Sequence, residues 1–292
     1  MKEEKKGKGR LVGNILLAAA IIGLAVALVG IFMTMRQYRI ASKEYDNLQQ
    51  EYIDAGDDGG SMIDFAALRE INPDFVGWIE IPNTKLSYPV VQTSDNDYYI
   101  EATFERTYNP SGSIFLDARV AGDMGDTNSI LYGHNMKDKT MFATVQNYCV
   151  DPEYRNLHDT IYFYTEKAVL VYEVFSMRQT TVEDPAYQLY FNSESEENTF
   201  LQEMDNGKGI LEEGDRIITL STCVNDGDPE TPHRYIVQGV LREEKPPVRE
   251  IPVPDASGTS SAQNTSSSQN ARSASQNASG SSQSASHSTS SQ

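Results

Sequence analysis

Cysteine is scarce in this chain of 292 residues, where only Cys149 and Cys223 occur. Two thiols are too few for the disulfide framework that stabilises many small exported proteins. A Cys149–Cys223 bridge is the one pairing open to the chain, and it would quench the only thiol that has chemical neighbours. No pair of Cys or His residues has metal-ligand spacing, so the sequence predicts no metal site and no cofactor.

Basic residues are also few, since 24 Lys and Arg stand against 42 Asp and Glu, which gives a formal net charge of −18. Proteins bind nucleic acid through Lys and Arg, so this balance argues against a nucleic-acid partner. The chain has no Gly-rich phosphate loop and no Gly-x-Ser-x-Gly nucleophile elbow, two signals of nucleotide binding and of hydrolases.

Charge is absent from residues 11–35, and residues 2–10 before them hold five basic residues against two acidic ones. At about 1.5 Å per residue, such a helix can cross a hydrocarbon core of roughly 30 Å. A cleaved signal peptide, the alternative, has a shorter apolar region that ends in small residues, whereas this run ends in larger ones. We therefore expect a cytoplasmic tail at 1–10, an uncleaved single-pass anchor at 11–35 and an extracellular remainder, because basic residues favour the cytoplasmic side.

Residues 36–60 are expected to form a juxtamembrane helix and a linker. An apolar stripe at helical spacing predicts a helix over 36–53; it consists of Tyr38, Ala41, Tyr45, Leu48 and Tyr52. The stripe fits a stalk helix that lies on the following domain or on the membrane, and self-association through the same stripe is the alternative. After a Gly- and Asp-rich break, Ser61 is expected to cap a short helix that ends near Asn72.

Residues 61–250 are expected to form one globular domain with a β-type apolar pattern. Eight predicted strands are separated by polar turn signals: 76–81, 87–92, 113–117, 128–133, 160–165, 168–177, 216–222 and 235–242. Such a series favours a closed or nearly closed barrel, which removes exposed strand edges. Helical spacing near 138–148 and 193–206 predicts two inserted helices. The tail, 251–292, is rich in Ser, Ala, Gln and Asn and is expected to be disordered, because it has little apolar surface to bury.

Three residues with complementary chemistry stand at predicted strand ends. Cys223 follows one segment directly, His134 follows a second, and Arg234 begins a third. A nearby cation lowers the pKa of a thiol and makes it a better nucleophile, and a guanidinium presents a planar set of donors to an oxyanion. These are the groups that thiolate attack on a carbonyl needs, and the prediction depends on the three residues meeting at one rim of the folded barrel. His233, beside Arg234, is the competing candidate for the base.

These residues resemble the sortase family, and specifically the class B sortases of Gram-positive bacteria, over about residues 61–245. The family motif Thr-Leu-x-Thr-Cys is similar to Thr219–Cys223, the segment around the family's catalytic His is similar to Leu131–Asn135, and the catalytic Arg looks like Arg234. The segments 72–79, 88–92 and 112–117 and the long inserted helix are also similar to class B sequences. The resemblance implies a mainly β fold, with an eight-stranded sortase β-barrel and added N-terminal and inserted helices.

The resemblance also implies an activity, that of a membrane-anchored cysteine transpeptidase. Such an enzyme cleaves a C-terminal sorting signal after Thr through a Cys thioester, with peptide hydrolysis as a side reaction. Cys223 would be the nucleophile, His134 the acid and base, and Arg234 the group that holds substrate and oxyanion. The implied partners are surface proteins that bear the sorting signal, an amine of cell-wall peptide or of pilin as acceptor, and membrane lipid around the anchor.

Further residues are assigned through the same resemblance. Substrate binding is implied for Asn96, Ile100, Tyr132, Ser221, Tyr187 and Tyr190, and packing within the barrel is their alternative role. Some class B members carry an Asp two residues after the Cys to assist the His. Here Asn225 holds that place, and Asp226, one residue later, is the candidate assistant.

Two other functions remain open from the sequence. One is a pilus-polymerising or other-class sortase, which differs in its acceptor amine. The other is an exported surface binding module whose Cys is buried and inert. The tail contains no LPxTG-like signal, so the chain does not resemble its own substrate.

Overall fold

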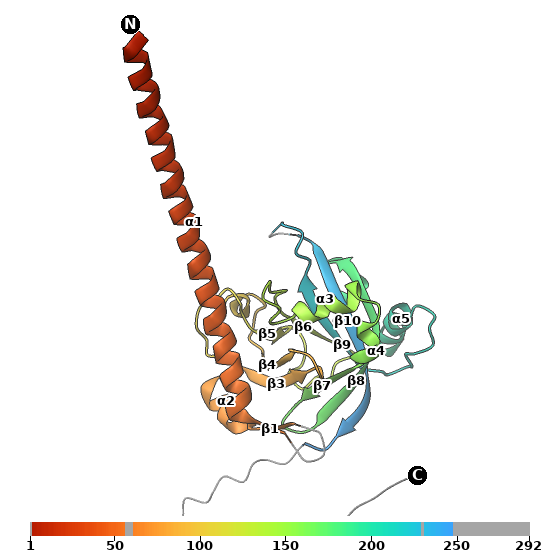
Figure 1. Cartoon of the computed structure of the whole chain (residues 1–292). Coiled ribbons are helices and arrows are strands. Elements are labelled where there is room, and N and C mark those ends of the chain that lie inside the picture. Colours follow the sequence, from red (N-terminus) through yellow and green to blue (C-terminus); the bar gives the residue numbers. More distant parts are fainter. Residues whose placement is uncertain (1, 56–60, 229–230, 248–292) are drawn as a thin grey trace, which may run out of the picture. The chain divides into compact units, whose positions relative to one another are not determined.

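The structure, a computed structural model, describes residues 2–55, 61–228 and 231–247 (Figure 1). Its elements in chain order are α1 (Lys2–Tyr52), β1 (Ile53–Ala55), β2 (Ser61–Ile63), α2 (Phe65–Ile71), β3 (Phe75–Glu80), β4 (Ser87–Val91), η1 (Tyr98–Ile100), β5 (Ile114–Leu116), β6 (Asn128–Tyr132), α3 (Ala143–Val150), α4 (Tyr154–Leu157), β7 (Thr160–Tyr164), β8 (Val169–Thr181), η2 (Pro185–Tyr187), α5 (Glu194–Asp205), β9 (Ile217–Cys223) and β10 (His233–Lys245).

Eight strands close into a barrel in the order β10-β8-β7-β3-β4-β5-β6-β9, which confirms the predicted mainly β fold. The pairs β4–β5 and β6–β9 are parallel, and the other pairs are antiparallel. Strands β8 and β10 run longer than their apolar patterns predict. Their polar ends still pair, for example His233 with Thr181, because backbone hydrogen bonding does not require apolar side chains.

The core of the barrel is built from large apolar side chains on inward-facing strand positions. Trp78, Phe163 and Tyr172 are fully buried, and side chains of this size each contribute roughly 1.5–3 kcal/mol by leaving water. Trp78 also donates its indole N–H to Ser87 Oγ over 2.9 Å, so its one polar atom is satisfied. Close packing explains the strand residue Gly77, where a Cβ atom would lie 2.6 Å from the Phe163 ring. The barrel is thus a packed scaffold, and its rim is where polar groups gather.

Helix α1 is continuous from Lys2 to Tyr52, so the predicted anchor and stalk form one rod. Among the described residues it is the one helix long and apolar enough to cross a membrane. Large apolar side chains from Ile15 to Met35 are exposed, whereas Ala41, Tyr45 and Leu48 are buried against the barrel. The apolar stripe therefore packs on the chain's own domain, as the stalk-helix interpretation predicts.

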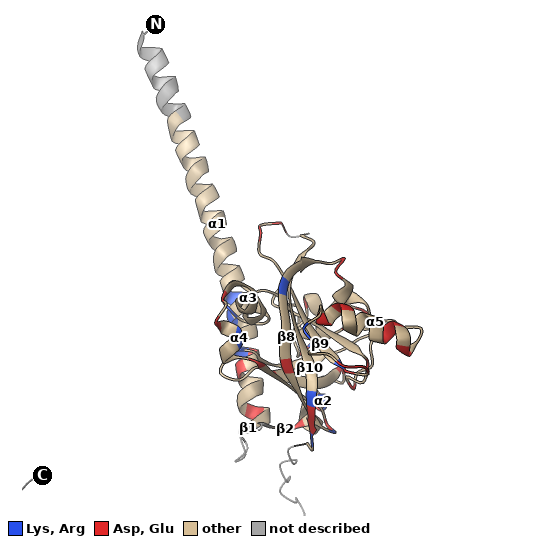
Figure 2. Cartoon of the chain, turned by 90° about the vertical axis from the view of Figure 1, so that its right-hand side faces the viewer, with Lys and Arg blue, Asp and Glu red and all other residues tan. Residues whose placement is uncertain are grey.

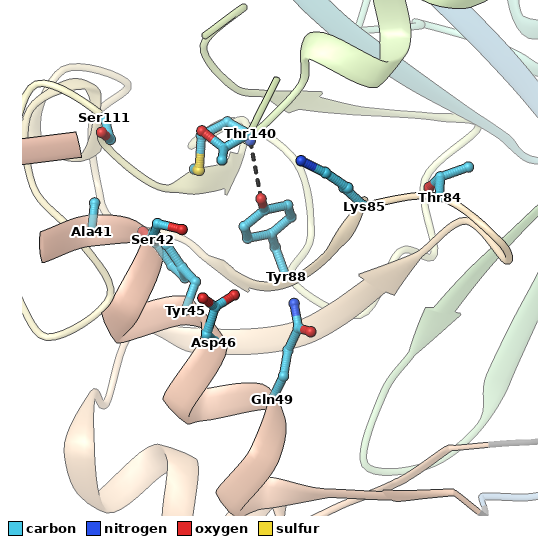
Figure 3. Close-up of a pocket in the computed structure, with 11 residues that line it drawn as sticks. Ala41, Ser42, Tyr45, Asp46, Gln49, Thr84, Lys85, Tyr88, Ser111 and Thr140 are labelled. Carbon is cyan, nitrogen blue, oxygen red and sulfur yellow. Dashed lines mark hydrogen bonds between the residues drawn. The ribbon is translucent and has the colours of Figure 1, made fainter. Parts of the chain in front are cut away.

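Polar contacts hold α1 to the domain along its last four turns. Asn109 Nδ2 donates to the Gln37 carbonyl over 3.0 Å, and the Tyr45 hydroxyl donates to the Gly112 carbonyl over 2.7 Å. A polar hollow of about 410 Å³ lies between α1 and the barrel. Lys85 and Gln49 extend toward it (Figure 3). The dashed line in that view joins the Tyr88 hydroxyl to the Met141 amide, which ties the loop after β6 to strand β4.

Two local predictions are wrong. Ser61 does not cap a helix but lies in β2, which pairs with β1; Asp64 caps α2 instead, accepting from the Ala67 amide over 2.9 Å. The first inserted helix begins at Ala143, because Met141 has a φ of 53° and bridges to Asn135. The second, α5, begins after Ser193 as predicted. Residues 56–60 of the linker and 248–292 of the tail lie outside the described residues.

Candidate active site

Three neighbouring strands bring the predicted thiol, imidazole and guanidinium to one rim. β9 lies between β6 and β10. Arg234 pairs directly with Cys223 across β9 and β10, while Tyr132 pairs with Ser221 across the parallel β6 and β9. His134 comes two residues after Tyr132, and Cys223 comes two residues after Ser221. The two therefore advance equally along parallel strands and reach the same level.

The backbone between the His and Cys strand ends is held by hydrogen bonds beyond the regular ladder. The Gly133 amide donates to the Ser221 carbonyl over 3.3 Å, and the Thr222 hydroxyl donates to the Gly133 carbonyl over 2.7 Å. The backbone at Gly133 is tightly packed, because a Cβ atom there would lie 2.5 Å from Ile114 Cδ1 and 2.9 Å from the Phe142 ring, so a larger residue would force these side chains to shift. The position of His134 is thus fixed from both neighbouring strands.

A cleft of about 620 Å³ opens over this rim. The residues that line it are Asn96, Ile100, Ser113, Phe115, Arg119, Tyr132, Gly133, His134, Val182, Tyr187, Ser221, Thr222, Cys223 and Arg234. The three predicted catalytic residues share this one cavity with five of the six predicted substrate-binding residues. Cys223 is only partly buried, so its sulfur is not sealed in the core.

The His134 ring is oriented by the loop that carries Ile100. Its Nε2 lies 2.8 Å from the Ile100 carbonyl oxygen. A carbonyl oxygen can only accept a hydrogen bond, so Nε2 carries the proton in this arrangement. On the other side of the cysteine, Arg234 Nη1 donates to the carbonyls of Thr231 and His233, over 2.5 Å and 2.9 Å. The guanidinium is thereby held at the start of β10, beside Cys223.

The predicted substrate-binding residues fall into two groups. Tyr187 and Ser221 join across the cleft through their hydroxyls, 2.7 Å apart, and Asn96 accepts from the Ala118 amide over 2.8 Å. Ile100 and Tyr132 line the same cleft as Asn96. Tyr190 is 65% exposed and is absent from the cleft lining. The first five residues therefore form the cleft, and Tyr190 lies outside it.

Asp226 forms its hydrogen bonds with residues other than the imidazole that it was predicted to assist. Its Oδ2 accepts from the Thr231 hydroxyl over 2.7 Å and lies 3.1 Å from Nδ1 of His233. The hydrogen bonds from Thr231 and His233 lower the pKa of Asp226 to about 2. His233, the competing candidate for the base, is occupied by this carboxylate and does not line the cleft.

Sequence reasoning missed a second cation in the cleft, Arg119. Its guanidinium binds both carboxylate oxygens of the fully buried Asp117, over 2.8 Å and 2.7 Å. The Tyr132 hydroxyl also donates to Asp117, over 2.9 Å. Burial opposes ionisation of Asp117, but the hydrogen bonds from Arg119 outweigh it and lower the carboxyl pKa. The available signal was an Asp-x-Arg spacing directly after a β-type segment.

The two cysteines differ sharply in their surroundings. Both are free thiols, so the Cys149–Cys223 bridge is not formed. Cys149 lies on α3, where burial raises the pKa of its thiol to about 11. In the part of the chain that the structure describes, no group of three His, Cys, Asp or Glu side chains could hold a metal ion.

Comparison with known proteins agrees with this geometry. Residues 79–242 match the family model described as Sortase domain. The chain is 33% identical to Sortase B of Staphylococcus aureus over 77% of its own length and 93% of that protein, and 35% identical to Sortase B of Listeria monocytogenes over 60% and 72%. The crystal structure of sortase B from Bacillus anthracis in complex with AAEK1 superposes with a TM-score of 0.61 at 30% identity, covering 71% of this chain and 98% of that one. The chain therefore belongs to the sortase family of cysteine transpeptidases and is related to its class B members.

Proposed function

We propose that this chain is a membrane-anchored class B sortase that cleaves a C-terminal sorting signal after Thr and transfers the protein to a cell-wall peptide amine. The observation that carries the proposal is the meeting of Cys223, His134 and Arg234 in one open cleft, at the ends of three adjacent strands. The alternative function, a surface binding module, predicts a cysteine that is buried and inert. Cys223 instead lines an open cleft of about 620 Å³.

The first half-reaction forms a thioester. The Cys223 thiolate attacks the Thr carbonyl carbon, and the carbonyl π electrons move onto oxygen to give a tetrahedral oxyanion. The oxyanion collapses, the C–N bond breaks, and His134 protonates the departing amine. His134 holds the proton that Cys223 lost when it became a thiolate; it gives that proton to the leaving nitrogen, so the amine departs neutral and His134 becomes neutral.

The second half-reaction reverses these roles. An acceptor amine attacks the thioester carbonyl, His134 removes a proton from that amine, and the C–S bond breaks to release the Cys223 thiolate. The products are a new amide bond and a regenerated enzyme. The two half-reactions therefore need no oxidant and no cofactor. Water in place of the amine gives hydrolysis as the side reaction.

Arg234 is suited to stabilise charge in both halves. It pairs across the ladder with Cys223, and two backbone carbonyls fix its guanidinium in place. A fixed cation costs little reorganisation when the oxyanion develops, and this preorganisation is the basis of oxyanion-hole catalysis. A guanidinium keeps its positive charge across the working pH range, so the stabilisation of the oxyanion is not lost when the pH changes.

The anchor and its direction are part of the same proposal. Residues 11–35 would cross the membrane, and residues 1–10 would lie in the cytoplasm because they carry the basic excess. Surface proteins that bear the signal, and an amine of cell-wall peptide or of pilin, would then meet the cleft outside the cell. Asn96, Ile100, Tyr132, Tyr187 and Ser221 would contact the signal peptide.

The decisive experiment incubates the purified chain with pentapeptides related to LPxTG and NPxTN and follows cleavage and the thioester by mass. We expect cleavage after Thr, loss of both products in Cys223→Ala, and full activity in the matched control Cys149→Ala. Retained cleavage in Cys223→Ala would refute the mechanism. Adding a stem-peptide amine or a pilin lysine peptide as acceptor distinguishes wall anchoring from pilus polymerisation.

A further inference from the structure

The domain is attached to α1 directly where the uncharged run ends. That run closes at Met35, and Arg36 is the first charge after it. Two residues after Met35, the Gln37 carbonyl accepts a hydrogen bond from Asn109 Nδ2 over 3.0 Å. Because a helix rises about 1.5 Å per residue, Gln37 stands roughly 3 Å beyond Met35. If the run spans the hydrocarbon core, the loop that carries Asn109 is held at the height of the lipid headgroups.

That loop presents a large aromatic side chain to solvent. Tyr108 precedes Asn109 and is 69% exposed. Tyrosine is enriched at membrane–water interfaces, where its ring meets the acyl boundary and its hydroxyl stays hydrated. An exposed Tyr beside the exit point of a membrane helix is therefore placed for insertion among headgroups.

A second loop reaches the same end of the domain. Thr140 and Met141 line the hollow against α1 together with α1 residues from Ala41 to Gln49, which stand roughly 9–21 Å beyond Met35 by helical rise. This loop carries Lys137 and Lys139, both exposed. The long side chains of Lys allow their ammonium groups to reach the headgroup layer while the backbone stays above it.

Basic residues are concentrated at this end of an otherwise acidic chain. The segments 36–43 and 137–139 contain five exposed cations, Arg36, Arg39, Lys43, Lys137 and Lys139. None of the five forms an ion pair with another residue that the structure describes. The one acid in these segments, Asp138, accepts from the amide and hydroxyl of Thr140. Figure 2 shows acidic residues on α5 and at the end of α1 nearest β1, and no charge along the tan stretch of α1.

We propose that Tyr108, Lys137 and Lys139, together with the cations at 36–43, form a bilayer-docking surface that binds anionic phospholipid headgroups. An anionic surface attracts clustered Lys and Arg next to a membrane span. Asp95, Asp97 and Glu101 line the hollow beside Tyr108 together with Arg106. The Tyr108 side of the surface therefore docks by aromatic insertion, and the Lys loop supplies the charge contact. The inference rests on the proposed anchor. Docking would hold the cleft near the bilayer, because His134 precedes Lys137 by three residues.

The test uses the full chain in lipid nanodiscs whose phospholipids carry bromine, a contact quencher of tryptophan fluorescence. Tyr108→Trp places a reporter on the docking surface, and Leu157→Trp, at a site 73% exposed on α4, is the matched control. The native Trp78 is fully buried and supplies a constant background. We expect loss of the added emission in Tyr108→Trp and none in Leu157→Trp. Equal quenching of the two overturns the docking surface.

The charge contribution is tested in the same discs with and without phosphatidylglycerol. Quenching of Tyr108→Trp is expected to increase with this anionic lipid and to fall when Lys137→Gln and Lys139→Gln are added. The paired control, Lys167→Gln with Lys245→Gln, removes equal charge where β7 and β8 meet and is expected to change nothing. Equal quenching in zwitterionic discs overturns the anionic-lipid assignment. Failure of the chain to enter discs at all refutes the anchor itself, and the docking surface with it.

Discussion

Asn135 donates its side-chain amide to the Cys223 backbone carbonyl over 3.0 Å, although 88 residues separate the two in the chain. The same amide reaches Gln146 Oε1 over 2.7 Å, and the backbone carbonyl of Asn135 accepts from Asn225 Nδ2 over 2.9 Å. Because Asn135 directly follows His134, this one residue ties the strand end of the imidazole to that of the thiol. We infer that Asn135 is a positioning residue for the pair.

Asn135→Asp is therefore expected to impair catalysis without removing either reacting group. The variant keeps the side-chain size but loses the amide donors, and it leaves the Cys223 and Gln146 acceptors unpaired, at a cost of about 1–3 kcal/mol each where the site is buried. We expect kcat to fall while KM for the peptide changes little, and the alkylation rate of Cys223 to drop with it. Thermal unfolding gives the stability loss separately. Unchanged kcat in a destabilised variant would assign Asn135 a structural role only.

Thiol labelling is expected to distinguish the two cysteines at neutral pH. Burial raises the pKa of Cys149 to about 11, so its thiol stays protonated and unreactive well below that pH. Iodoacetamide should then modify Cys223 alone in the folded protein, and both thiols after denaturation. Mass spectrometry of Cys149→Ala and Cys223→Ala checks the assignment. Labelling of Cys149 that matches Cys223 in the folded chain contradicts the prediction.

The sequence places Cys223, His134 and Arg234 each at the end of an apolar β-type segment, but this pattern alone could not show that they converge; the resemblance to sortases implied it. Strand ends are few, and closure of the barrel brings three of them together. The same pattern could not predict Asn135 or Arg119. Both are polar residues outside the strands, and the contact between Asn135 and Cys223 depends on which strands become neighbours, which the apolar period does not specify.

Local errors in the prediction have equally physical causes. Ser61 and Asp64 are both good helix caps, and the pairing of β1 with β2 decided between them, because it draws Ser61 into a strand. The stripe from Tyr38 to Tyr52 was compatible with several partners. Its burial against the barrel depends on tertiary contacts such as that of Tyr45 with Gly112, to which a periodic pattern gives no access.

The pair of Asp117 and Arg119 is expected to govern peptide affinity more than chemistry. Arg119 lines the cleft, while Asp117 is buried beneath it and holds the guanidinium by two hydrogen bonds. Asp117→Asn weakens both charge-assisted bonds, each worth about 1.5–3 kcal/mol, so the cation is freed to move. KM for the pentapeptide should rise several-fold with a smaller change in kcat. Titration calorimetry with Cys223→Ala checks binding alone, and unchanged affinity would remove Arg119 from the recognition surface.

Asp226→Asn is expected to leave the acid limb of the pH–rate profile unchanged. The carboxylate faces Thr231 and His233 rather than His134, and its pKa of about 2 keeps it ionised throughout the working range. A folded-state pKa below the ordinary 3.8 contributes stability that is present above that value and disappears as the pH falls toward 2. The difference in melting temperature between wild type and variant should accordingly shrink between pH 4 and pH 2. A shifted acid limb of kcat/KM would instead show that Asp226 acts on His134 during turnover.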